Sequence, residues 1–436
     1  MKDAGVLTSE VGIIILLVVL TLIVALVARR LKFPYTLALV LAGLLLGEVH
    51  LFHHFTLDPE VVLFLFLPAL LFEGAWNTDV QALRDDWLPI FLLAVPGLLL
   101  SLGIIALVVH WGAGLPVLLA FLLGAIVSPT DPIAVLGLLR QLGMPKRLNA
   151  LIEGESLFND GVGAAVFELV LAAVLLSLHQ PSELDGLSPL LVVLKVLDLL
   201  GGGLVIGVGV GLLISQFVRV IEDPLFETTV TFCVAYGVYI LATLVGSSGL
   251  LAVVGAGLTL GSYGRRIGLT ELTQETVDTV WEFISYIANS LLFLLVGIEI
   301  GQTQTAFGGA LSTIFWAIIG VLLGRAIMVY LFLPLHAAFV HWRGNRETTE
   351  KHRSDIIPVP PSWYPLILLS GLRGALSLAL VLSLQSSIPQ LQTLRLAVYG
   401  VVLVTLLGQG IGLRVLLPRW PGGISTHPAK TASSAA

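Results

Sequence analysis

Residues Leu151–Gly163 read L-I-E-G-E-S-L-F-N-D-G-V-G and place several polar side chains inside a long apolar segment. On a helix, Glu155 and Asn159 are four residues apart, as are Ser156 and Asp160, so the four share one arc of roughly 140°. An ionised carboxylate in the core of a bilayer costs about 2.5 kcal/mol or more. We therefore expect this arc to face protein or a water-filled cavity and to serve a function.

The composition is typical of a protein that crosses a membrane many times. Of the 436 residues, 57% are hydrophobic and 11% are charged, and the mean hydropathy is +1.00. Long uncharged apolar runs recur throughout the chain, which excludes a soluble globular domain of ordinary composition. The single cysteine, Cys233, excludes an intramolecular disulfide, and the nine histidines show no metal-ligand spacing. These features predict an all-α polytopic membrane protein without a cofactor.

Thirteen apolar segments are candidate spans, although the second and ninth are short for a hydrocarbon core of about 30 Å. The first could be mistaken for a signal peptide, but its basic cluster follows the apolar run instead of preceding it. The predicted spans are residues 9–28, 34–47, 59–76, 87–109, 115–139, 148–178, 188–218, 226–246, 248–262, 276–299, 306–340, 363–385 and 396–417.

Lysine and arginine are distributed very unevenly between the two sides of these spans. The odd-numbered connections and the C-terminal tail hold seventeen of them, whereas the N-terminus and the even-numbered connections hold two. The positive-inside rule then predicts an odd number of spans, an N-terminus outside and a C-terminus in the cytoplasm. The tail at residues 418–436 is short and rich in small residues, and we expect it to be disordered.

Two of the spans contain residues that interrupt a helix. Span five contains Ser128-Pro129-Thr130-Asp131-Pro132, and span twelve contains Leu369-Ser370-Gly371-Leu372-Arg373-Gly374-Ala375. Each proline removes a backbone donor and disfavours helix in the residue before it. The freed carbonyls would form a polar spot at mid-membrane, with Asp131 near the N-terminus of the following half-helix; a simple proline kink is the alternative. The corresponding positions of the two interruptions predict inverted repeats with a site between them.

Arg325 lies deep in span eleven, where it needs a carboxylate or several carbonyl groups as partners. Glu155 is the first candidate and Asp131 the second, while Arg373 in span twelve competes for the same carboxylates. The sequence leaves this pairing open.

Asp160 is then the carboxylate without an obvious cation. Such a group can hold either a proton or a small hard cation, with the Ser156 hydroxyl and a freed carbonyl near Thr130 as further ligands. Asn159 would brace the interrupted segment through its amide. Glu73, near the end of span three, is either a second acidic ligand or a glutamate whose side chain reaches the membrane surface.

Six motifs that follow one another along the membrane portion resemble those of the NhaP/NHE-type sodium/proton antiporters. They are P-A-L-L-F-E at Pro68–Glu73, T-D-P at Thr130–Pro132, G-E-S-L-F-N-D at Gly154–Asp160, F-L-L-V-G-I-E at Phe293–Glu299, G-R-x-I at Gly324–Ile327 and G-L-R-G-A at Gly371–Ala375.

This resemblance implies thirteen spans and a homodimer. It implies an ion-transport bundle of spans four to six and eleven to thirteen (87–178 and 306–417) beside dimerisation helices of spans one to three and seven to ten (1–76 and 188–299). It also implies that Asp160 carries the exchanged ions, helped by Ser156, the Thr130 backbone and Glu73. An ion pair between Glu155 and an arginine, and an Asn159-Asp160 pair typical of electroneutral one-for-one exchange, are further implications.

The leading hypothesis is a sodium (or lithium) for proton antiporter that works by alternating access. A potassium/proton antiporter of the same fold is the alternative, and a cation channel is less consistent because no repeated carbonyl filter motif occurs. Residues 154–157 also match a G-x-S-x serine motif, with His336 late in span eleven, but proteolysis leaves the acidic neighbours of Ser156 unexplained. We therefore expect a transporter of the plasma (inner) membrane and not an enzyme. Its expected partners are membrane lipid, monovalent cations, protons and a second copy, with no nucleic acid.

Overall fold

The computed structural model describes residues 2–31, 35–49, 62–132, 135–136, 139, 143–179, 189–219, 223–302, 307–344 and 357–416. Within these residues the regular elements are helices, and no strand occurs among them. Each of the thirteen predicted spans overlaps a described helix. The predicted tail at 418–436 lies outside the described residues.

In the first part of the chain, one π-helical turn precedes α4 and another joins α6 to α7. The elements are α1 (Lys2–Leu31), α2 (Tyr35–Glu48), η1 (Val62–Phe66), α4 (Leu67–Asn77), α5 (Val80–Asp85), α6 (Trp87–Leu92), η2 (Leu93–Gly97), α7 (Leu98–Ala113), α8 (Val117–Val127) and α10 (Lys146–His179). The predicted span at 87–109 is divided at η2, which contains Pro96. Proline cannot donate the usual helical hydrogen bond, and a π-turn accommodates this locally.

From residue 189 onward the chain includes the longest helix described, α17, with 38 residues. The elements are α12 (Pro189–Val218), α13 (Pro224–Leu244), α14 (Gly249–Thr259), η3 (Leu260–Gly264), α15 (Arg265–Ile267), α16 (Glu271–Gln302), α17 (Phe307–Gly344), η6 (Pro361–Trp363), α18 (Tyr364–Leu369), α19 (Ala375–Leu382) and α20 (Leu391–Leu416). Within the described part of the chain, seven helices are long and apolar enough to cross a bilayer, and three shorter apolar helices accompany them. The predicted all-α polytopic membrane fold is confirmed.

Glycines allow α12 to pack against α14 at backbone contact. A Cβ on Gly203 or Gly207 would overlap the carbonyl oxygens of Ser248 or Ala252. The G-x-x-x-G spacing of span seven predicts this close approach, and the structure confirms it. Glycines also allow α2 and α16 to pack at backbone contact, and the sequence analysis did not predict this contact.

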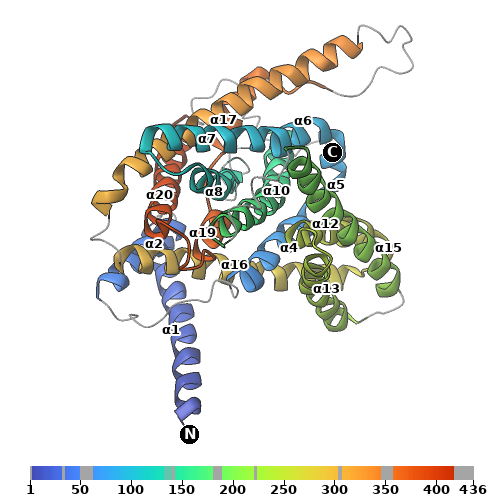
Figure 1. Ribbon diagram of the computed structural model, residues 1–436. Helices are drawn as coiled ribbons and strands as arrows, with labels where there is room; N and C mark the ends of the chain where they lie inside the picture. The colour runs from blue at the N-terminus through green and yellow to red at the C-terminus, as the bar shows by residue number, and fades with distance from the viewer. Residues whose placement is uncertain are drawn as a thin grey trace, which may run out of the picture.

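The interrupted helices lie at the centre of the molecule. Figure 1 shows α8, α10 and α19 in the middle, surrounded by other helices, while α1 projects away from them. Span five leaves helical geometry after Val127, and span twelve is non-helical between Leu369 and Ala375. The two predicted interruptions are therefore present, and α10 and α19 both pack against α8.

Candidate functional site

The two interrupted segments contact each other through their main chains. The Asp131 N–H donates to the Leu372 carbonyl at 2.8 Å, and the Ala375 N–H donates to the Asp131 carboxylate at 3.4 Å. Position 374 must be glycine, because a Cβ there would overlap the Asp131 carboxylate. Asp131 thus lies at the N-terminus of α19 in span twelve, where a negative charge is favourable. The sequence analysis placed Asp131 at the N-terminus of the second half-helix of span five, and part of that half-helix lies outside the described residues.

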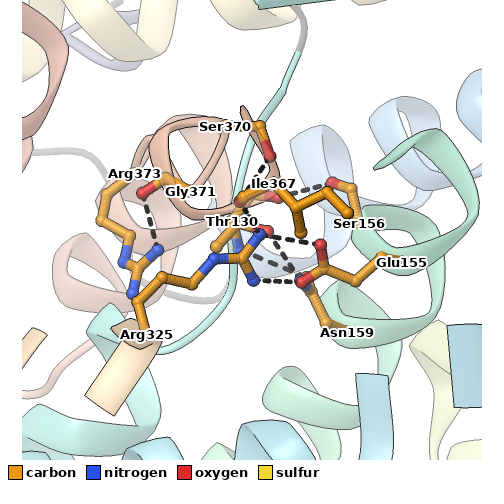
Figure 2. A network of polar contacts seen from close by, with 9 residues as sticks. All are labelled: Thr130, Glu155, Ser156, Asn159, Arg325, Ile367, Ser370, Gly371 and Arg373. Carbon is orange, nitrogen blue, oxygen red and sulfur yellow. Dashed lines mark hydrogen bonds and ion pairs between the residues drawn. The ribbon is translucent and has the colours of Figure 1, made fainter. Parts of the chain in front are cut away.

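Asn159 braces α10 against the interrupted segment of span five, as predicted. Its amide nitrogen donates to Thr130 Oγ1 at 2.7 Å and to Glu155 Oε1 at 3.3 Å, and its oxygen accepts from the Thr130 N–H at 3.2 Å. One turn earlier, Ser156 Oγ donates to the Thr130 carbonyl at 2.5 Å. Figure 2 shows these side chains pointing from α10 towards Thr130. The spacing of three residues between Ser156 and Asn159 therefore brings both side chains onto one unwound peptide.

Arg325 pairs with Glu155 in the interior, which was the first of the predicted pairings. Both terminal nitrogens of the guanidinium contact the carboxylate, with Nη2 at 2.8 Å from Oε2, and Nη2 also donates to the Ile367 carbonyl at 2.8 Å. The side chains are 3% and 1% exposed. Gly371 makes room for this pair, because a Cβ there would lie 2.8 Å from Arg325 Nε. The bidentate geometry and the carbonyl together satisfy a charge pair that burial would otherwise penalise.

Arg373 finds a different partner. Its side chain is buried, and Nη1 donates to the Gly371 carbonyl at 2.8 Å in the non-helical stretch that follows α18. In the described part of the chain no carboxylate forms an ion pair with Arg373. The expected competition for Glu155 is therefore resolved in favour of Arg325, and Arg373 faces the carbonyl-rich end of a half-helix.

A cavity of about 660 Å³ reaches this site. Its lining includes five carboxylate side chains together with Ser156, and the carboxylates are Glu73, Asp131, Glu153, Asp160 and Glu282. The exposed side chain of Asn77, which donates to Glu73 at 2.8 Å, also lines it. The cavity thus extends from the surface at the end of α4 to the centre of the protein.

Three of the four predicted ion ligands, Asp160, Ser156 and Glu73, line this cavity, but Thr130 does not. The Thr130 carbonyl accepts the Ser156 hydroxyl, so its remaining lone pair is the one free for another donor or cation. Across the described residues, no three His, Cys, Asp or Glu side chains lie close enough to hold a metal ion together.

The sequence analysis assigned no role to Glu153 or Glu282, which both line the cavity. The sequence could have identified Glu153 as a cavity residue. It precedes Ser156 by three residues and Asp160 by seven, so it falls on the same helix face. Glu282 lies on α16, and only tertiary packing brings it to α10.

A second polar cluster joins α16 to α20. Glu299 accepts from Arg395 Nη1 and, at 2.6 Å, from the Tyr399 hydroxyl, while Arg395 Nη2 donates to the Leu384 carbonyl at 3.4 Å. The predicted topology puts this cluster at the outer membrane surface, opposite the cavity mouth at Asn77. Glu299 belongs to one of the six motifs, but its partners could not be identified from sequence.

Comparison with known proteins shows the family to which the chain belongs. Residues 15–419 match the family described as "Sodium/hydrogen exchanger, transmembrane". The chain belongs to the sodium/hydrogen exchanger family. It is 38% identical over 390 residues to the Na⁺/H⁺ antiporter ApNhaP of Aphanothece halophytica, covering 89% of this chain and 70% of ApNhaP. It is 37% identical over 387 residues to the low-affinity Na⁺/H⁺ antiporter NhaS1 of Synechocystis sp., covering 88% of this chain and 69% of NhaS1.

The fold of this exchanger-family chain is similar to that of the sodium proton antiporter MjNhaP1 from Methanocaldococcus jannaschii. The TM-score is 0.72 at 19% sequence identity, over 93% of this chain and 99% of MjNhaP1. The family predicted from the six motifs is confirmed. Family membership and the apolar helices together support cation/proton exchange by an integral membrane protein.

Proposed function

We propose that the chain exchanges Na⁺ (or Li⁺) for H⁺ across a membrane, with Asp160 holding the two ions alternately. The observation that carries this proposal is the isolation of Asp160 beside the cavity. Among the described residues, no hydrogen bond or ion pair involves its side chain, and its charged neighbours, Asp131 and Glu155, are both acidic. A half-buried carboxylate in such a place requires a proton or a cation to balance its charge.

The proposed ligands of the cation are oxygen atoms, which small hard cations prefer. Asp160 and Ser156 lie one helical turn apart on α10 and line the same cavity. The Thr130 carbonyl lies next to the Ser156 hydroxyl, and Glu73 on α4 would complete the set. Asn159, Asp131, Glu155, Arg325 and Arg373 hold this geometry without binding the ion.

The charge balance favours electroneutral one-for-one exchange. Arg325 neutralises Glu155, and the neutral Asn159 amide is committed to Thr130. This leaves Asp160 as the carboxylate at the head of the cavity whose charge the transported ion must balance. One proton would then leave for each monovalent cation that enters.

Alternating access would arise by movement of the bundle (87–178 and 306–417) against the dimerisation helices (1–76 and 188–299) of a homodimer. By the predicted topology, with the N-terminus outside the plasma (inner) membrane, the cavity mouth at Asn77 faces the cytoplasm. The Glu299–Arg395 contact would then hold the outer side closed. The described state therefore corresponds to an inward-open step of the cycle.

The test is ion-driven proton flux in proteoliposomes, with Na⁺, Li⁺ and K⁺ compared and the membrane potential either clamped or free. We expect saturable Na⁺- or Li⁺-driven flux that is insensitive to potential and is abolished by Asp160→Asn. Asp198→Asn is the matched control, because that carboxylate is exposed and lies away from the cavity; it should retain flux. Sustained coupled flux in Asp160→Asn would contradict the proposed site.

The same measurement separates the alternatives. Flux driven mainly by K⁺ would identify a potassium/proton antiporter that uses the same site. Potential-driven current without proton coupling would identify a channel.

A further inference from the structure

A second cavity, of about 500 Å³, lies between two groups of helices on the side of the molecule where Figure 1 shows α5, α6 and α12. Its volume falls within the roughly 300–1,000 Å³ of typical small-ligand sites. The side chains of α5, α6 and η2, with Phe158 of α10, form one wall. Val208 and Leu212 of α12 and Leu258 of α14 contribute to the other wall. The lining is almost entirely apolar, which suits a hydrocarbon chain.

This apolar cavity lies next to a polar one, with which it shares lining residues. Leu83, Arg84 and Trp87 line both the 500 Å³ cavity and a neighbouring pocket of about 900 Å³, whose lining carries charges of both signs. Trp87 is 57% exposed and Phe91 is 48% exposed, three and seven residues after Arg84. A basic residue, a tryptophan and a phenylalanine in this order are typical of a chain that enters a bilayer from its surface.

Two charges of opposite sign remain available where the two cavities meet. Arg147 pairs with Asp86, and Asp79 accepts two backbone N–H groups at the start of α5. By contrast, Arg84 and Asp85 are exposed, and the described residues offer no ion pair to either. Arg84 and Asp85 therefore lie side by side above an apolar slot, and the exposed Lys146 adds a second basic side chain to the polar pocket.

We propose that this composite cavity binds one phosphatidylethanolamine molecule of the cytoplasmic leaflet. Arg84 would bind the phosphate, and Asp85 would accept hydrogen bonds from the protonated amine. An acyl chain would follow Trp87 and Phe91 into the apolar cavity as far as Leu212. The paired charges select against a purely anionic headgroup, because Asp85 would repel it. They also select against choline, which has no N–H to donate.

The proposed position gives the lipid a mechanical role. One wall belongs to the predicted transport bundle and the other to the predicted dimerisation helices, so an acyl chain between them would resist their relative movement. This consequence rests on the proposed exchange function, whereas the binding itself does not.

The test is retention of lipid by the purified full-length protein. The protein would be equilibrated with phosphatidylcholine vesicles containing a minor fraction of phosphatidylethanolamine or phosphatidylglycerol. Bound lipid would then be counted by native mass spectrometry. We expect one retained phosphatidylethanolamine, and roughly fivefold weaker retention in Arg84→Gln, the effect of one basic side chain near a lipid headgroup. Arg30→Gln, an exposed arginine on α1, should retain the lipid.

Two further variants test the slot and the amine. Leu212→Trp should fill the cavity and remove the retained lipid, whereas Leu213→Trp, at a neighbouring position that is 72% exposed, should not. Asp85→Asn should abolish the preference for phosphatidylethanolamine over phosphatidylcholine. Equal retention of all three lipids by the wild type, or a preference for phosphatidylglycerol, would overturn the proposal. Asp160→Asn should still retain the lipid, so a failure of this proposal and a failure of the exchange proposal are distinguishable.

Discussion

The buried charges of the site differ in how each is balanced. Glu155 is neutralised by Arg325, Arg373 is held by a carbonyl, and Asp131 lies at the N-terminus of α19. Asp160 has only acidic charged neighbours. Residue types alone could not distinguish these cases, because the three carboxylates and two arginines are compatible with several pairings. The distinction singles out Asp160 as the group whose charge a transported ion must balance.

Removing Arg325 should leave the buried Glu155 carboxylate without its cation. We expect Arg325→Ala to lower the free energy of unfolding by about 3–5 kcal/mol, because Glu155 would remain buried without a cation. Thermal unfolding in detergent measures the loss. The double variant Glu155→Gln/Arg325→Met should recover much of the stability, since neither buried charge then remains. An Arg325→Ala protein as stable as the wild type would show that the pair does not support the fold.

Protons and sodium should compete for Asp160. As pH falls, the protonated fraction of Asp160 rises, so the apparent affinity for Na⁺ should weaken. The limit is about tenfold per pH unit once the proton dominates, because one pH unit corresponds to a tenfold change in proton concentration. Flux measured against Na⁺ concentration at several pH values provides the test. An apparent affinity that does not change with pH would exclude a shared carboxylate.

At the scale of elements, α10 and the unwound part of span five act as one unit. Asn159 makes two hydrogen bonds to Thr130 across this junction and a third to Glu155 within α10, each worth about 1 kcal/mol when its partner can be rehydrated and more when it stays buried. The unwound peptide of Thr130 otherwise lacks helical partners for its N–H group. The amide therefore keeps the interrupted segment in register with α10.

Asn159→Ala should disrupt this junction. We expect a loss of about 2–3 kcal/mol in stability and a larger proportional loss of exchange rate, because Thr130 is no longer held beside Ser156. Thermal unfolding and proteoliposome flux would be measured on the same preparation. The control is Asn77→Ala, whose amide bonds Glu73 at the exposed end of α4 and should change stability little. Unchanged flux in Asn159→Ala would mean that the brace is dispensable.

At the scale of the whole molecule, the predicted topology puts the cavity mouth and the Glu299 cluster on opposite sides of the membrane. If the cluster closes the outer side, Glu299→Gln should weaken closure by about 1–2 kcal/mol and lower the ratio of inward-open to outward-open molecules roughly fivefold or more. Because the chain has a single cysteine, a Cys233→Ser background permits labelling at one chosen position. Leu70→Cys, which lines the cavity, should then react more slowly with an impermeant maleimide applied from the cytoplasmic side.

The control for this labelling experiment is a variant that removes an ion pair other than the Glu299–Arg395 contact. Lys195→Gln breaks the exposed contact with Asp198 and should leave the labelling rate unchanged. Equal labelling in Glu299→Gln and in the wild type would show that the cluster does not bias the conformational equilibrium.

The sequence by itself determined the all-α membrane fold, the two interrupted helices and the polar arc of α10. These features depend on local chemistry: apolar run length, proline and glycine positions, and the spacing of residues along a helix. Only the tertiary structure decided that Arg325 and not Arg373 takes Glu155, that Asp131 lies at α19, and that Glu282 reaches the cavity. Contacts between residues more than a hundred positions apart depend on how helices pack, and residue types at single positions do not encode that packing.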